Sequence, residues 1–341
     1  MHQAMLFEKL TDSRVRCNTC QWHCNIAAGR KGVCRMYQNV DGILYNLNYA
    51  QASSVAADPI EKKPLFHFYP GSQVFSLGSW GCNFHCSGCQ NWEISCVNNP
   101  LKGGQILPLE AVRLAKEYGC RGIAWTYNEP TVWFEYTLDS AKLARESGLY
   151  TAYVSNGFMT TEALDAIGPY LDAYRIDVKG FTAEAYTELA NIKEWKGILD
   201  NAKRAREKWK MHVEVVTNIV PEINDDDFQL EGIAHWIKEE LGELTPWHVT
   251  RFYPHYNMTD VQESPVESLE HAIDIGKKAG LKFVYAGNIP GHESENTTCY
   301  SCGKMVIQRQ GYQTKILALK DDSCAYCGAN LNIRIDREIK Q

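Results

Sequence analysis

The sequence predicts an α/β fold built on a parallel β-sheet, with a cysteine-rich segment near each end of the chain. From residue 72 onward, short apolar runs with strand character alternate with helical patterns over about six units. Most of the 13 cysteines fall into three groups, at residues 17–34, 82–89 and 299–327. The alternation favours a closed or nearly closed βα barrel over an open doubly wound sheet. Periodicity alone does not distinguish these two arrangements.

Length, charge and hydropathy restrict the class of protein. The chain has 341 residues, enough for about two domains, and 35 basic against 41 acidic residues give a net charge of −6. General nucleic-acid binding requires a clustered basic excess, which is absent here. No apolar run reaches the ~20 residues of a membrane span, and the N-terminus does not resemble a signal peptide. We therefore expect a cytoplasmic protein with no specific nucleic-acid or membrane partner, whose clustered thiols hold metal.

The expected domains are residues 1–71, 72–290 and 291–341. The first contains four cysteines and a β-rich lead-in that includes LFHFY at 65–69. The expected strands of the second are 74–80, 121–126, 149–154, 171–178, 211–220, 247–253 and 281–286. The expected helices are 109–119, 132–148, 226–242 and 266–280, several of which end at glycine, as helices often do. The third is expected to be short and rich in strands and turns.

Cys82, Cys86 and Cys89 form a Cys-x3-Cys-x2-Cys motif directly after the first expected strand. Iron–sulfur clusters are held by cysteine thiolates, and a closed site needs four protein ligands. Because no fourth ligand lies at matching spacing, we expect one metal position to be open for an exogenous ligand. The loop after a strand is also where barrel enzymes carry their chemistry. The alternative is a structural zinc completed by Cys96 or His85.

This motif, together with its surroundings, resembles a known family. SWG precedes it at 79–81, QNWEIS follows it at 90–95, and YNEPT occurs at 127–131. These segments resemble radical S-adenosylmethionine (radical SAM) enzymes of the AmmeMemoRadiSam group, relatives of pyruvate formate-lyase activating enzymes. The resemblance covers nearly the whole chain. It implies a partial (βα)6 TIM-like barrel and a [4Fe-4S] cluster whose open iron binds S-adenosylmethionine.

The resemblance also implies the reaction. One electron entering the cluster cleaves the sulfonium C–S bond, which gives methionine and a 5′-deoxyadenosyl radical that abstracts hydrogen. An electron donor such as flavodoxin or ferredoxin is expected. A glycine of a partner protein is one candidate target, and a small molecule or peptide is another. The competing class is a non-enzymatic iron–sulfur electron carrier or zinc scaffold, although such a protein has no use for a charged pocket at the barrel mouth.

Polar residues at two strand ends are candidate contacts for S-adenosylmethionine. The second strand runs into Tyr127, Asn128 and Glu129, and a carboxylate before a proline-initiated helix is well placed to accept from an ammonium group. Glu129 could instead be a first-turn residue favoured by the helix dipole. On the fourth strand, the period of two places Asp177 and Lys179 on the face of Arg175, opposite the apolar face. The resemblance implies that Asp177 and Lys179 lie by the cofactor, with Lys179 suited to the methionine carboxylate.

Three further candidates come from other strand ends. Asn156 lies in a turn like the Thr-Asn-Gly of activating enzymes, although Val154 replaces the Asp that can hold a cation there. Glu214 on the fifth strand is a candidate interior contact. Tyr256, beyond the sixth strand, could reach the ribose or substrate. Many family members place an aromatic residue just before the third cysteine, where this chain has Gly88, so that Trp92 or Tyr256 is expected to stack on adenine.

The outer cysteine groups have complete ligand sets. Cys299, Cys302, Cys324 and Cys327 form two Cys-x2-Cys-Gly knuckles, the spacing of a zinc ribbon, and we expect a structural zinc with mononuclear iron as the alternative. The four N-terminal cysteines could hold zinc or an auxiliary iron–sulfur cluster, and sequence spacing does not discriminate between them. They are Cys17, Cys20, Cys24 and Cys34.

Overall fold

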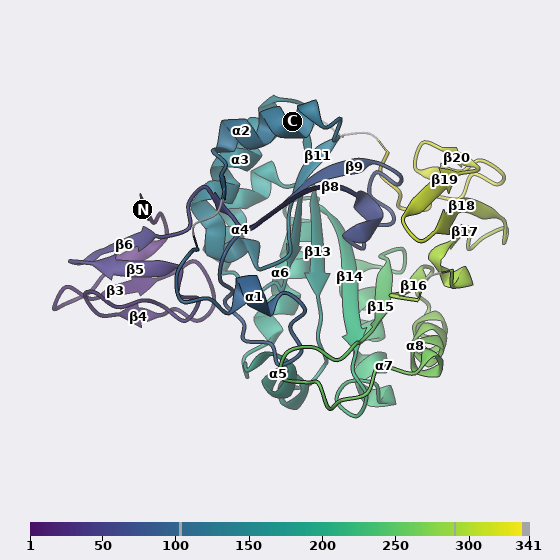
Figure 1. The fold of residues 1–341 in the computed structure, drawn as a ribbon. Helices are drawn as coiled ribbons and strands as arrows, with labels where there is room; N and C mark the ends of the chain where they lie inside the picture. The colour runs from purple at the N-terminus through teal and green to yellow at the C-terminus, as the bar shows by residue number, and fades with distance from the viewer. Residues whose placement is uncertain (102–103, 290, 336–341) are drawn as a thin grey trace.

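A computed structural model describes residues 1–101, 104–289 and 291–335, and its centre is an eight-stranded sheet (Figure 1). In spatial order the strands are β16 (Val284–Gly287), β15 (Trp247–Arg251), β14 (His212–Ile219), β13 (Ala173–Asp177), β12 (Tyr150–Ser155), β11 (Gly122–Trp125), β9 (Gln73–Gly78) and β8 (Ser54–Pro59). All neighbours are parallel except β8, which pairs antiparallel with β9. The order ends at β16 and β8, so the sheet does not close into a complete barrel. The predicted α/β fold with a parallel sheet is confirmed.

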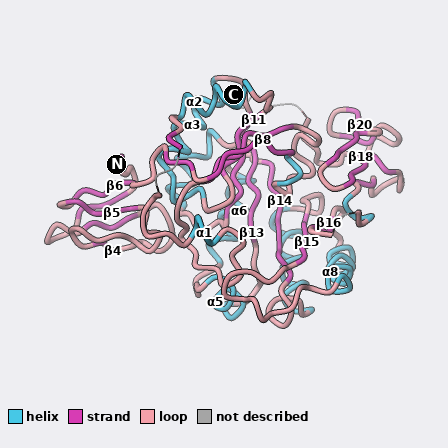
Figure 2. Tube along the Cα trace, in the orientation of Figure 1, coloured by secondary structure: helices cyan, strands magenta, loops and turns pink. Residues whose placement is uncertain are grey.

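Helices cover the outer face of the sheet (Figures 1 and 2). They are α2 (Pro108–Glu117), α3 (Phe134–Glu146), α4 (Thr161–Ile167), α5 (Ala183–Ala190), α6 (Lys196–Glu207), α7 (Asp227–Trp236) and α8 (Val266–Ala279), whereas the single turn α1 (Trp92–Ser95) follows the cysteine loop and packs against the N-terminal segment. Because parallel neighbours follow one another along the chain, right-handed crossovers place the helices on one side. The main core lies between helices and sheet, where Trp125, Tyr174 and Trp247 are fully buried.

The opposite, inner face of the sheet is closed at one end by residues 60–69, here called the plug. Small side chains of β11, β12 and β13 leave room for Phe68 and Tyr69 of this segment. The plug begins with the short helix η1 (Ile60–Lys62) and is otherwise irregular, so the β-rich stretch expected at 65–69 is not formed. Two of its backbone N–H groups, those of Phe66 and His67, donate to the Glu214 carboxylate instead of to a neighbouring strand.

The expected strands all correspond to observed ones, with ends that shift by a few residues. Helices α4, α5 and α6 were not among the named patterns. In α6 the buried residues Ile198, Leu199, Ala202 and Ala205 keep helical spacing among charged residues, so the sequence pattern of this helix was present but was not identified. The π-helical turn at Ile237–Leu241 extends α7, and η2 (Pro130–Trp133) precedes α3.

The N-terminal segment forms two small three-stranded sheets beside α3, in purple in Figure 1. One contains β1 (His2–Gln3), β6 (Ile43–Asn46) and β5 (Tyr37–Val40), and the other β2 (Phe7–Lys9), β3 (Val15–Cys17) and β4 (Asn25–Ile26). A separate pair joins β7 (Gln51–Ala52) to β10 (Gly104–Gln105). Buried Glu135 of α3 ties this segment to the sheet domain, since it accepts from the Met5 backbone at 3.0 Å and the Tyr37 hydroxyl at 2.7 Å.

The C-terminal segment packs against the plug and β16. Its strands are β17 (Thr297–Thr298), β18 (Met305–Gln310), β19 (Gln313–Ile316), β20 (Leu319–Lys320) and β21 (Ser323–Cys324). Arg309 donates to the Phe66 carbonyl at 2.7 Å, and His67 hydrogen-bonds the Leu331 carbonyl at 2.8 Å. Since β8 and the plug belong to the sheet domain, that domain begins before residue 72. The predicted boundary at residue 290 and residues 336–341 lie outside the described residues.

Within the described ranges, no helix combines the length and the apolar character that crossing a membrane requires.

Candidate active site and metal centres

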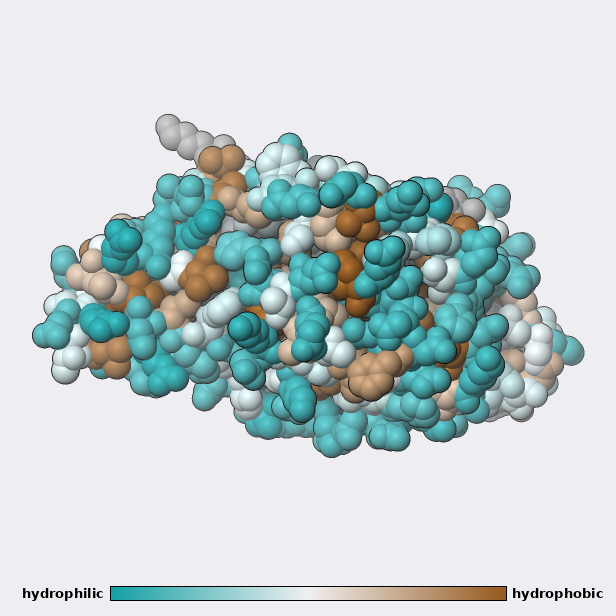
Figure 3. All heavy atoms as spheres, turned by 90° about the horizontal axis from the view of Figure 1, so that it is seen from below, coloured by the Kyte–Doolittle hydropathy of each residue, from teal (hydrophilic) through white to brown (hydrophobic). Residues whose placement is uncertain are grey.

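A cavity of about 510 Å3 lies where the parallel strands end. That volume is within the range of small-molecule sites, and the carboxyl edge of a parallel sheet is where such sites form. Its lining includes Cys82, Cys86, Cys89, Thr126, Tyr127, Asn128, Glu129, Val154, Ser155, Asn156, Arg175, Asp177, Lys179, Asn218, Thr250, Lys63 and Tyr312. Figure 3 views the molecule from below Figure 1, the side toward which β13 and β14 point, and shows apolar atoms between hydrophilic ones.

The loop between β9 and α1 holds the three central cysteines. The Asn128 side chain accepts from the Ser79 backbone at 2.9 Å and donates to the Gly81 carbonyl at 2.7 Å, which fixes the chain just before Cys82. Gly81 has φ +80°, and a Cβ there would lie 2.8 Å from the Cys34 carbonyl oxygen. Only glycine fits this close approach. Asn128 therefore positions the cysteine loop.

The three central thiols face the cavity and have no competing fourth ligand in its lining. Neither Cys96 nor His85 lines the cavity. Burial raises the pKa of the Cys86 thiol to about 11, although the nearby Lys179 ammonium opposes that shift. A cation that binds the thiolates would offset this desolvation. Three thiols around an open cavity form the donor set of an iron–sulfur cluster with one exchangeable position.

Glu129 is buried at the start of η2 and joins two strand ends. Its Oε1 accepts from the Thr131 backbone at 3.0 Å and the Ser155 hydroxyl at 2.9 Å, and its Oε2 accepts from the Asn156 backbone at 2.7 Å. Burial raises the pKa of Glu129, whereas these donors lower it. Oε2 retains capacity to accept another donor, such as an ammonium group in the cavity.

Charged side chains of β13 form the opposite part of the lining. Asp177 pairs with Arg175, and the Lys179 Nζ lies 3.6 Å from an Asp177 oxygen. Burial favours the neutral acid, but Arg175 and Lys179 outweigh it and lower the pKa of Asp177. Burial likewise disfavours the Lys179 ammonium, yet Cys86 and Asp177 raise its pKa overall. The Arg175 Nε is buried and has no hydrogen-bond partner among the described residues.

Tyr127 and Asn156 also line the cavity, but their polar side-chain atoms contact protein groups. The Tyr127 hydroxyl donates to Asp58 at 2.7 Å, and its ring lies under the Lys63 ammonium. The Asn156 side chain donates to the Asn83 side chain at 2.8 Å. Asn156 thus connects the end of β12 to the residue after Cys82.

The structure places Glu214 and Tyr256 outside the cavity lining. Glu214 is fully buried under the plug, where its oxygens meet the Phe66 and His67 backbones and both His212 and His248. Burial opposes its ionisation, but the two histidines lower its pKa. The plug fills the inner face at this level, so a small-molecule ligand cannot reach Glu214.

The aromatic contacts also differ from those expected. Tyr256 stacks on Trp92 with ring centroids 5.3 Å apart, and neither residue lines the cavity. A Cβ at Gly88 would lie 3.0 Å from the Phe252 ring and 3.1 Å from the Met258 sulfur. These two side chains therefore occupy the space that an aromatic residue before the third cysteine would need.

Lys63 and Tyr312 are lining residues that sequence reasoning missed. Lys63 comes from the plug, and Tyr312 from the turn between β18 and β19. Both reach the cavity through packing between distant segments, for which no local sequence pattern exists.

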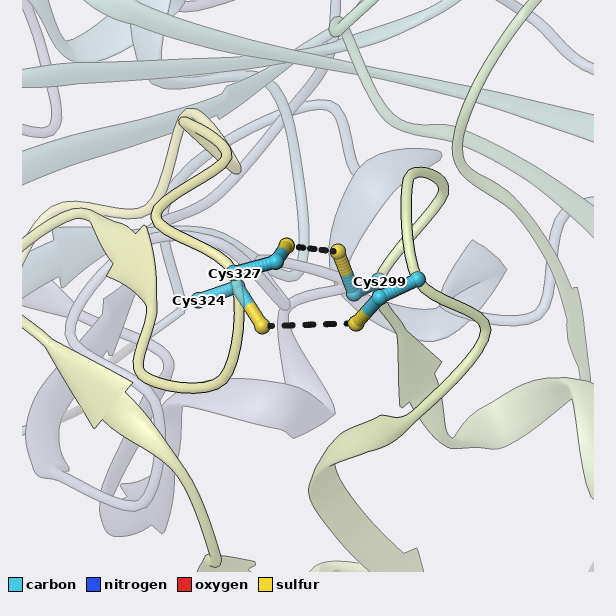
Figure 4. Close-up of side chains that lie close together, drawn as sticks. Cys299, Cys324 and Cys327 are labelled. Carbon is cyan, nitrogen blue, oxygen red and sulfur yellow. Dashed lines mark hydrogen bonds between the residues drawn. The ribbon is translucent and has the colours of Figure 1, made fainter.

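The C-terminal cysteines form a compact group (Figure 4). The Cys299 and Cys327 sulfurs are 3.6 Å apart, and those of Cys302 and Cys324 are 3.8 Å apart. All four sulfurs lie within 4.8 Å of one another. Tetrahedral zinc with bonds of about 2.3 Å separates its sulfurs by about 3.8 Å. The donor set therefore fits a single tetrahedral metal ion.

Comparisons with known proteins agree with the geometry of the cavity. The sequence model of the radical SAM superfamily matches residues 79–230, which include the three central cysteines. The chain is 43% identical over 336 residues to uncharacterized protein MJ0808 of Methanocaldococcus jannaschii, covering 98% of this chain and 99% of that protein. Residues 79–230 of this chain therefore carry a radical SAM domain.

One further protein is similar in sequence, and one solved structure is similar in fold. Over 140 residues the chain is 26% identical to the (2S)-3-sulfopropanediol dehydratase activating enzyme of Klebsiella oxytoca, covering 39% of this chain and 43% of that one. The fold is similar to a radical SAM methyltransferase from Sphaerobacter thermophilus, with a TM-score of 0.51, 16% identity and coverage of 70% and 71%. The radical SAM domain implies a [4Fe-4S] cluster and S-adenosylmethionine, and it supports radical chemistry by cleavage of S-adenosylmethionine.

Proposed function

We propose that this chain is a radical SAM enzyme of the AmmeMemoRadiSam group, with a partial (βα)6 TIM-like barrel and chemistry like that of activating enzymes. The observation that carries the proposal is the cavity at the carboxyl edge of the sheet, where three thiols face an acidic and a basic wall. S-adenosylmethionine carries an ammonium and a carboxylate on its methionine part. A site with Glu129 on one side and Lys179 with Arg175 on the other complements both groups.

Each lining residue has a role in this proposal. Cys82, Cys86 and Cys89 would hold the [4Fe-4S] cluster. Glu129 would accept from the methionine ammonium, and Lys179 would donate to the carboxylate. When bound, the cluster and S-adenosylmethionine supply one-electron cleavage of the sulfonium and a 5′-deoxyadenosyl radical.

The remaining residues keep these groups in place. Asn128 and Asn156 hold both sides of the cysteine loop, and Asp177 holds Lys179 and Arg175 in the charged wall. The plug closes the inner face behind the cavity and so limits access of water from that side.

The similarity to an activating enzyme supports a protein substrate for this chain. We propose a glycine of that protein as the site of hydrogen abstraction. A one-electron donor such as flavodoxin or ferredoxin would reduce the cluster. The C-terminal cysteines are proposed to bind a structural zinc, because their sulfurs already have tetrahedral spacing.

The test is production of 5′-deoxyadenosine. Anaerobically reconstituted protein, given dithionite and S-adenosylmethionine, should release the nucleoside, and the Cys82→Ala/Cys86→Ala/Cys89→Ala variant should release none. Cys120→Ala is a matched control, because Cys120 is buried away from the cavity. An intact cluster without nucleoside would instead support the electron-carrier class.

A further inference from the structure

We propose that Cys17, Cys20, Cys24 and Cys34 bind a second, auxiliary iron–sulfur cluster rather than zinc. Cys17 ends β3, Cys20 and Cys24 lie in the turn between β3 and β4, and Cys34 lies in the loop before β5. Their side chains line one small cavity that also touches Val132 of η2. Three of the cysteines are buried and Cys24 is half-buried, so any group bound there is enclosed by protein.

The distances between the sulfurs distinguish a site for one zinc ion from a site for an iron–sulfur cluster. Tetrahedral zinc requires all four sulfurs to lie about 3.8 Å apart. Across the described residues, only the C-terminal group brings three or more metal-ligating atoms within 4.8 Å of one another. Every set of three N-terminal cysteines therefore includes a sulfur pair farther apart than 4.8 Å. A single ion cannot bridge that separation at normal bond lengths, whereas a cluster binds each thiolate at a different iron.

The central cysteines provide an internal standard for this argument. Cys82, Cys86 and Cys89 belong to the superfamily motif that holds a [4Fe-4S] cluster, and they too fall outside the compact spacing. The chain thus contains two groups with wide spacing and one with tetrahedral spacing. The N-terminal group therefore has the same wide sulfur spacing as Cys82, Cys86 and Cys89.

Hydrogen bonds to the N-terminal sulfurs suit a cluster. The Val33 backbone N–H donates to the Cys24 sulfur at 3.5 Å, and the Thr19 hydroxyl lies 3.5 Å from the Cys17 sulfur. Such donors stabilise the negative charge of a cluster and tune its potential.

The site also adjoins the loop that carries the central cysteines. A Cβ at Gly81, the residue before Cys82, would touch the Cys34 carbonyl at 2.8 Å, and Trp22 donates to the Asn83 carbonyl at 2.7 Å. Two clusters held by contacting loops should influence each other's electron spins when both are reduced. A zinc ion at the N-terminal site would have no such effect.

The decisive experiment measures metal in the Cys82→Ala/Cys86→Ala/Cys89→Ala variant, which leaves the N-terminal segment intact. After anaerobic reconstitution, this variant should retain iron and acid-labile sulfide in equal amounts, with an electron paramagnetic resonance signal after reduction. The wild-type protein should hold about twice that iron if both clusters are [4Fe-4S]. Its reduced spectrum should be broadened relative to that of the variant.

Further variants guard against misfolding and adventitious iron. Cys24→Ser, which changes the half-buried ligand, should lower the retained iron and sulfide, and Cys120→Ser should not. Absence of iron from the triple variant, iron without sulfide, or a second zinc lost in Cys24→Ser would each overturn the proposal. Nucleoside production is not used, so wild-type protein with two clusters but no 5′-deoxyadenosine would contradict the proposed function alone.

Discussion

The two outer cysteine groups each offer four thiols, but they occupy different environments. The N-terminal group is enclosed between small sheets and η2, and its sulfurs are spread around a cavity. The C-terminal group lies on surface loops, where Cys302 and Cys327 are exposed and the sulfurs are in near contact. Equal numbers of thiols therefore do not define equal metal sites. The separation of the sulfurs in space decides how many metal atoms they can bind.

The two segments also differ in how far their stability rests on contacts other than those of the cysteines. The C-terminal strands are short, and their small core includes Cys299 and Cys324 themselves. A segment of this size would gain much of its stability from a bound metal ion. The N-terminal sheets also pack against Trp80 and Val132, and Glu135 attaches them to α3. We infer that metal loss unfolds the C-terminal segment more completely than the N-terminal one.

The largest expected effect is that of Cys324→Ser. This change removes one of four ligands from a tetrahedral site, and structural zinc sites contribute on the order of 10 kcal/mol to folding. Zinc should fall from one per chain to near zero, with iron unchanged. Hydrogen exchange should then show fast exchange in β17 to β21. Cys120→Ser again serves as the control, and unchanged zinc in Cys324→Ser would show that the compact group does not bind it.

The next effect concerns the cavity between the two groups. Lys179→Met removes a half-buried cation that faces the cavity but leaves Asp177 paired with Arg175. Charge-assisted hydrogen bonds contribute about 1.5–3 kcal/mol, so binding of S-adenosylmethionine should weaken roughly 10- to 100-fold. Calorimetric titration of the reconstituted protein measures this loss.

A surface lysine provides the comparison for that variant. Lys203→Met removes a cation from a solvent-exposed pair with Glu240 and should leave binding unchanged. Both variants should retain the metal content of wild type. Equal affinity for S-adenosylmethionine in Lys179→Met and wild type would remove Lys179 from the proposed site.

The sequence made the strands, the cysteine motif and the lining positions of Glu129 and Lys179 predictable, because each follows from local periodicity at a strand end. Glu214 shows the limit of that approach. The sequence predicted that its side chain faces the interior of the barrel. It did not predict that residues 60–69, the plug, cover this side chain, because the pattern of a strand does not show which segment packs on the inner face. Tyr256 and Gly88 show the same limit, since Trp92, Phe252 and Met258 approach from other loops.

Acid should loosen the C-terminal segment before the N-terminal one. Burial lowers the pKa of His67 to about 3, so the folded state keeps this residue neutral where the unfolded state binds a proton below pH ~6.5. The stability that it contributes is therefore complete above pH ~6.5 and is lost as the pH falls toward 3, at up to about 1.4 kcal/mol per pH unit. When the pH is lowered from 7 to 5, amide hydrogen exchange in β17 to β21 should accelerate, after correction for the pH dependence of the intrinsic exchange rate. His67→Gln should reduce this acceleration.

The smallest expected effect tests the attachment of the N-terminal segment. Burial raises the pKa of Glu135, so its charge is held at a cost that the Met5 and Tyr37 donors offset. Glu135→Gln keeps one acceptor oxygen for Met5 or Tyr37 but places an amide N–H against the other donor. The free energy of unfolding should fall by about 1 kcal/mol. Hydrogen exchange should rise modestly in β5 and β6, with iron content unchanged. Iron loss in Glu135→Gln would mean that the N-terminal site depends on its docking to α3, and that enclosure, as well as sulfur spacing, distinguishes it from the C-terminal group.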